Sequence, residues 1–107
     1  MRYYVSDDGG VVRPASPTEW AVWFDRMSLA AFEDGGRMVA RTELPGDVLV
    51  STVFLGVDHN YSGDGPPLVF ETMVFRRGSG GEFWRYTTEA DAVKGHGNAV
   101  EMVTLEG

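Results

Sequence analysis

The sequence predicts an α+β fold, in which a mostly antiparallel sheet of four to five strands forms a meander and carries two helices packed on one face. Strand-like runs follow one another between about residues 37 and 87, and turn residues separate them. Stretches with apolar residues at helical spacing flank this region on both sides. With 107 residues, of which 43% are hydrophobic, the chain is expected to form a single domain over residues 1–107.

The N-terminal stretch predicts a short hairpin and then a helix. Strand-like residues on either side of the turn signal at residues 7–10, Asp-Asp-Gly-Gly, predict the hairpin. Ser16 fits the cap of the helix, Pro17 its first position, and Glu19 the third position of a capping box. The apolar stripe that follows consists of Trp20, Trp23, Phe24 and Met27. We interpret this stripe as core rather than as a ligand platform, and Gly35-Gly36 as the end of the helical region.

The middle of the chain predicts four strands, at residues 37–44, 48–55, 68–75 and 82–87. A tight turn is predicted between the first two strands, a long loop between the next two, and a glycine-rich hairpin loop over residues 76–81. Glu71 interrupts an apolar row of its strand. Burial of an unpaired carboxylate costs on the order of several kcal/mol or raises its pKa, so we expect Glu71 to have a partner.

The C-terminal stretch predicts a second helix, capped by Thr88 and running to about Val103. The apolar face of this helix includes a histidine, in the series Ala92, His96, Ala99 and Val103. Gly95 and Gly97 beside it predict a close backbone approach or a local break. His96 is either a buried neutral histidine, hydrogen-bonded to a backbone carbonyl or to Glu71, or a ligand-binding or catalytic residue. In both cases we expect His96 and Glu71 to lie near each other.

The long loop carries oxygen-bearing side chains at the spacing of the first half of an EF-hand: Asp58, Asn60, Ser62 and Asp64. Position 12 of an EF-hand must be a glutamate, but this sequence has Val69 there. An Asx-rich loop without a metal is therefore the alternative. A second set, His59, Glu71 and His96, would suit zinc if the fold brought the three together. No cofactor is expected, and these two sets are the places where a divalent metal would bind.

Composition limits the classes of partner. The chain has no cysteine, so it has neither disulfides nor thiolate metal ligands, and a cytoplasmic location is expected. Sixteen acidic and nine basic residues give a net charge of −7, which argues against direct binding to nucleic acid. No signal-peptide-like segment or apolar run of membrane-spanning length occurs in the sequence, so no membrane partner is expected.

Three blocks, STVFLGVDHN, PPLVFETMVF and RYTTEADAVKGH, lie within residues 41–100. In order and spacing they resemble a recurring group of small proteins encoded by actinobacterial phages and prophages. The resemblance implies a phage or prophage of a high-GC host as the source and the cytoplasm of that host as the location, but it brings no activity with it. The positions that match the blocks are Asp58, His59, Glu71, Thr72, Arg85, Tyr86 and His96.

We therefore expect a small phage-type accessory protein, a non-enzymatic binding module that acts on a host protein or a small molecule. A homodimer is expected, because an exposed edge strand readily pairs. The ligand-binding candidates are His96, Glu71, His59, Asp58, Arg85 and Tyr86. The alternative is a metal-dependent, hydrolase-like enzyme that uses Asp58, His59, Glu71 and His96, which requires these four side chains to converge in one pocket.

Overall fold

The computed structural model describes residues 2–7, 11–30, 37–62 and 64–106. Strands β1 (Tyr3–Asp7) and β2 (Val11–Ala15) form an antiparallel hairpin, and helix α1 (Pro17–Ala30) follows. The predicted N-terminal hairpin and first helix are therefore confirmed. The turn residues 8–10 and the predicted end of the helical region at Gly35-Gly36 lie outside the described residues.

Both helices begin at the predicted caps. The backbone N–H of Glu19 donates to the Ser16 side-chain oxygen over 3.1 Å at the start of α1. The backbone N–H of Asp91 donates to the Thr88 side-chain oxygen over 3.1 Å at the start of α2 (Glu89–Glu106). Each bond satisfies an N–H group that has no partner within the helix, which explains why these residues fix the helix starts.

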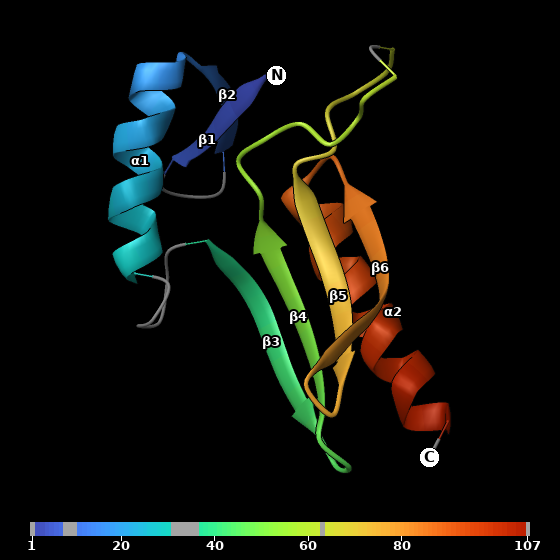
Figure 1. Ribbon diagram of the computed structural model, residues 1–107. Helices are drawn as coiled ribbons and strands as arrows, with labels where there is room; N and C mark the ends of the chain where they lie inside the picture. The colour runs from blue at the N-terminus through green and yellow to red at the C-terminus, as the bar shows by residue number, and fades with distance from the viewer. Residues whose placement is uncertain (1, 8–10, 31–36, 63, 107) are drawn as a thin grey trace.

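The larger sheet is an antiparallel meander in the order β3-β4-β5-β6. Its strands are β3 (Met38–Leu44), β4 (Val48–Phe54), β5 (Phe70–Arg76) and β6 (Ser79–Tyr86). The two helices and two antiparallel sheets confirm the predicted α+β class (Figure 1).

One hairpin connection is shorter than predicted. Strand β6 begins at Ser79, so the loop expected over residues 76–81 is a tight turn at Arg77 and Gly78. Both turn residues have positive φ, 52° and 80°. The turn glycines that follow belong to the strand instead, and Gly80 lies opposite Phe75, where a Cβ would come within 3.2 Å of the Met73 sulfur.

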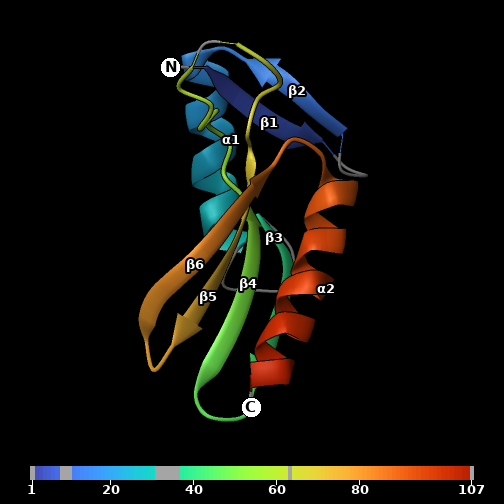
Figure 2. The ribbon, with the colours of Figure 1, turned by 90° about the vertical axis from the view of Figure 1, so that its right-hand side faces the viewer.

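The two helices pack in different places. Helix α2 lies along one face of the four-stranded sheet (Figure 2), and its buried residues are the predicted ones, Ala92, His96, Ala99 and Val103. Helix α1 lies against β1 and reaches the sheet through Trp23, whose ring meets Phe54 edge-on with centroids 5.4 Å apart. The other stripe residues of α1 pack against the same buried cluster, so the core interpretation of the stripe is confirmed.

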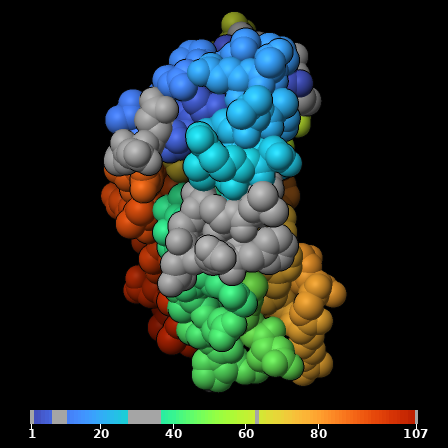
Figure 3. Space-filling view, turned by 90° about the vertical axis from the view of Figure 1, so that its left-hand side faces the viewer, coloured from blue at the N-terminus to red at the C-terminus, as the bar shows by residue number. Residues whose placement is uncertain are grey.

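The molecule is elongated, with extents of 44 × 33 × 24 Å. Figure 3 shows α1 and the hairpin at one end and the β3–β4 hairpin at the other. At that second end the Arg77 N–H donates to the Asp47 carbonyl over 2.9 Å, which joins the two tight turns of the sheet. Within the described ranges, neither helix is long and apolar enough to span a membrane.

Candidate functional site

His96 inserts from α2 into a set of threonine hydroxyls on the sheet. Its Nδ1 lies 2.8 Å from Oγ1 of Thr52, and its Nε2 lies 2.8 Å from Oγ1 of Thr42. Thr52 in turn lies 2.6 Å from Thr72, hydroxyl to hydroxyl. Burial lowers the pKa of His96, which favours the neutral ring. A neutral imidazole has one donor and one acceptor nitrogen, so His96 donates to one threonine and accepts from another.

Glu71 lies on the other side of the sheet. The Nε of Arg85 donates to its carboxylate over 3.0 Å, and the two residues are directly opposite in the β5–β6 register. The prediction that Glu71 has a partner is confirmed. The prediction that Glu71 lies near His96 is wrong. The reason is strand alternation: Thr72 faces α2 and His96, so its neighbour Glu71 faces away.

Asp58 holds the long loop to the N-terminus. Its carboxylate accepts hydrogen bonds from the backbone N–H groups of Asn60 (2.8 Å) and Leu68 (2.9 Å), and it also pairs with Arg2. Burial acts to raise the pKa of Asp58, but the two N–H groups and the Arg2 guanidinium outweigh it, so the pKa is lowered. These contacts give Asp58 a structural role that its position in the sequence did not reveal.

The other polar residues of the loop bond to the loop itself. The Asn60 amide donates to the carbonyls of Asp64 (2.7 Å) and Pro66 (3.0 Å), and the Ser62 hydroxyl donates to the Asp64 carbonyl over 3.0 Å. This pattern fits the Asx-rich loop of the alternative interpretation. Gly63, the sixth position of the EF-hand spacing, lies outside the described residues.

The four residues of the hydrolase hypothesis do not converge. Asp58 and His59 belong to the loop, where the His59 Nδ1 donates to the Val57 carbonyl over 2.9 Å. His96 and Glu71 lie on opposite sides of the sheet. In the parts of the chain that the structure describes, no group of three or more His, Asp or Glu side chains is placed to hold a metal ion, so the His59, Glu71 and His96 set is not assembled.

Tyr86 and Arg85, the remaining candidates, are adjacent on β6 and point to opposite sides. Tyr86 lies on the side of α2, where its hydroxyl packs against the backbone of Gly95. The close approach predicted at this glycine is therefore confirmed. Arg85 lies on the far side, where its guanidinium is 4.6 Å from the centroid of the Phe83 ring in addition to its pairing with Glu71.

The sheet side away from α2 carries a largely apolar surface, which we call the open face: Leu49, Val53, Met73, Phe75 and Phe83. Ser51 and the Glu71–Arg85 pair lie on the same side of the sheet. Leu49 is opposite Phe75 in the register, and Met73 is opposite Phe83. No helix among the described elements covers this side of the sheet (Figures 1 and 2). The Phe83 side chain is 50% exposed, and the other four are half-buried.

Sequence reasoning assigned no role to the open face, although a signal for it was present. Both alternating rows of β4 and of β5 are mainly apolar, yet a single helix layer can cover only one side of a sheet. The charged residues on the open face are paired within it: Arg41 with Glu43 over 2.9 Å, and Arg85 with Glu71 over 3.0 Å. The face thus has no net charge, whereas the whole chain has −7.

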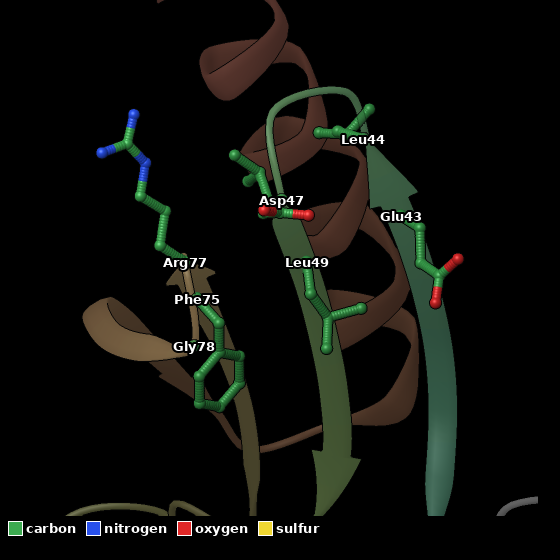
Figure 4. Close-up of a pocket in the computed structure, with 8 residues that line it drawn as sticks. Glu43, Leu44, Asp47, Leu49, Phe75, Arg77 and Gly78 are labelled. Carbon is green, nitrogen blue, oxygen red and sulfur yellow. The ribbon is translucent and has the colours of Figure 1, made fainter.

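A hollow of about 710 Å³ lies at the turn end of the open face (Figure 4). Leu49 and Phe75 project into it from adjacent strands, on the side of the sheet away from α2. Glu43 and Arg77 stand on its two flanks, and Asp47 lies in the turn above it. The hollow combines an apolar floor with charged side chains of both signs at its edge.

Comparisons with known proteins do not add to this picture. No protein-family model, no curated protein and no solved structure matches the chain.

Proposed function

We propose that this chain is a non-enzymatic binding module that binds a protein partner through the open face. The observation that carries the proposal is the largely apolar surface on the sheet side that no described helix covers. Antiparallel sheets commonly keep their solvated face polar, and continuous exposed apolar surface is typical of interaction sites. Burial of this surface by a partner would supply the free energy of binding.

The polar groups around the open face support a protein partner. Protein interfaces have an apolar centre depleted of charges and a polar rim. Here Leu49, Met73 and Phe75 lie on the two central strands, between the Arg41–Glu43 pair on β3 and Arg85 on β6, which pairs with Glu71 on β5. The hollow at the turn end is large enough to receive a bulky side chain of the partner.

A small-molecule ligand is the second candidate, because the volume of the hollow falls within the range of roughly 300–1,000 Å³ for such sites. A protein is preferred because the apolar surface extends beyond the hollow to Val53 on β4, Met73 on β5 and Phe83 on β6. In line with the resemblance to phage proteins, the partner is a protein of the bacterial host and the site of action is the host cytoplasm. The four residues of the hydrolase alternative lie apart, so they do not support hydrolytic chemistry.

A charge substitution in the apolar part of the open face tests the proposal. Wild type, Leu49→Glu and the control Val93→Glu are immobilised, and host-lysate proteins that bind wild type are identified, purified and titrated against all three by calorimetry. Val93 is a matched control because it is 54% exposed on α2, remote from the open face. We expect wild type and Val93→Glu to bind the purified partner equally, and Leu49→Glu to bind it at least about tenfold more weakly, because a carboxylate would be desolvated in the interface.

Circular dichroism and thermal melting establish that both variants are folded before the titration. Equal affinity of all three proteins for every partner would refute the open face as the binding surface. Leu49 lines the hollow as well as the open face, so Met73→Glu, outside the hollow, separates the two candidates. It should weaken the binding of a protein partner, whereas a small molecule in the hollow would be bound by Met73→Glu as by wild type and lost with Arg77→Ala.

A further inference from the structure

We infer that in the free protein the open face is covered by a second copy of the chain, so that two sheets pack face to face with both α2 helices outside. This inference rests on the proposed function, because it concerns the same surface. A host partner and the second copy would compete for the open face. Partner binding would therefore be coupled to dissociation of the dimer, and its apparent affinity would fall as the protein concentration rises.

The size of the open face is sufficient for a modest dimer. Four strands about 4.8 Å apart and about seven residues of 3.3 Å in length give a flat area of about 440 Å². This area is below the roughly 800 Å² per partner of standard interfaces, so the dimer is expected to be weak and transient. A dimer of this kind needs the whole face, from Leu49 to Phe83. Two such faces can pack about 10 Å apart with interdigitating side chains, as in β-sandwiches.

The charge pattern favours a second copy as the occupant. When identical surfaces meet, any net charge on them opposes the same charge, so a self-associating face must be neutral or self-complementary. The open face carries Arg41 and Arg85 paired with Glu43 and Glu71, and it is neutral within a chain of net charge −7. At its turn end, Arg77 and Asp47 again contribute one charge of each sign.

The structure also offers a test against the simplest competing dimer, in which two β6 edges pair. Phe83 and Trp84 are neighbours on β6 that point to opposite sides of the sheet: Phe83 belongs to the open face, and Trp84 lines a groove against α2 with Tyr86 and Met102. They are 50% and 37% exposed. A face-to-face dimer buries Phe83 and leaves Trp84 outside, whereas an edge-to-edge dimer brings both residues to the junction.

Sedimentation equilibrium of wild type, Phe83→Glu and Trp84→Glu tests the inference, with circular dichroism to establish that each is folded. We expect wild type to dimerise with a Kd in the micromolar range, as for an interface near the lower size limit. Phe83→Glu should raise this Kd at least about tenfold, since a carboxylate would be buried opposite an apolar face. Trp84→Glu should leave the Kd within about twofold of wild type.

Each other outcome overturns the inference. If wild type is monomeric at several hundred micromolar, the dimer is refuted. The proposed function is then still tested independently by the partner titration with Leu49→Glu. Loss of the dimer in both variants assigns it to the β6 edge, and loss in neither assigns it to another surface. If Phe83→Glu does not fold, Met73→Gln replaces it as the substitution on the same face.

Discussion

His96 connects α2 to the sheet through the threonine hydroxyls of two strands, β3 and β4. The ring is buried, and both of its nitrogens lie within hydrogen-bond distance of threonine hydroxyls. A protonated His96 would therefore have hydroxyl groups but no carboxylate as partners, which agrees with the lowered pKa.

The stability of the protein is expected to depend on pH through His96. Because burial lowers the pKa of the folded state, the unfolded chain takes up a proton first when the solution is acidified. The contribution of His96 is thus complete above the unfolded pKa of roughly 6.5 and is lost as the pH falls toward the folded pKa. Urea unfolding of wild type and His96→Gln between about pH 7.5 and about pH 5 should show that the advantage of wild type shrinks with acidification.

The difference between the two proteins isolates His96 from the carboxylates, which titrate in both. A difference that stayed constant over the whole pH range would contradict the prediction. It would mean that the folded protein does not hold the His96 ring in its neutral form.

At the scale of elements, the packing of α2 against the sheet depends on one glycine. A Cβ added to Gly95 would lie 2.1 Å from the Tyr86 hydroxyl oxygen, whereas a Cβ added to Gly97 would meet nothing within 4 Å. Gly95 therefore allows the helix to approach β6 closely. Gly97 has no such contact, and in a helix interior it costs about 1 kcal/mol relative to alanine.

The same substitution at these two sites should have opposite effects. Gly97→Ala is expected to raise the free energy of unfolding by about 1 kcal/mol through helix propensity. Gly95→Ala is expected to lower it by about 1–2 kcal/mol, because displacement of the Tyr86 ring outweighs the gain in propensity. Denaturant unfolding at neutral pH measures both. A stabilised Gly95→Ala would mean that the helix does not sit against Tyr86 as described.

The elements themselves could be predicted from the sequence, because their signals are local. The side chains that cap the helices lie within three residues of the N–H groups they satisfy, and the spacing of Ala92, His96 and Ala99 identified the buried face of α2. The partner of His96 could not be predicted. Alternation fixes that Glu71 and Thr72 point to opposite sides, but it does not say which side α2 takes.

On the scale of the whole molecule, the N-terminal hairpin is joined to the sheet through the segment after β4. The Tyr4 N–H donates to the Gly56 carbonyl over 2.9 Å, and the Asp58 N–H donates to the Arg2 carbonyl over 3.0 Å. Gly56 has a φ of 76° and lies so close to α1 that a Cβ would be 2.9 Å from the Trp20 indole nitrogen. These contacts link residues about fifty positions apart. The role of Asp58 could therefore not be predicted from local sequence patterns.

The response to salt is the last expectation and belongs to the whole molecule. Two copies of net charge −7 repel each other, while the open face between them is neutral and apolar. Added salt shortens the Debye length from about 10 Å at 0.1 M to about 3 Å at 1 M, so it weakens the repulsion and leaves the apolar attraction intact. The wild-type dimer should therefore have a Kd several-fold lower at about 1 M than at about 0.1 M sodium chloride by sedimentation equilibrium. Weaker dimerisation at high salt would instead indicate that ion pairs between the copies hold them together, which is incompatible with a neutral open face as the interface.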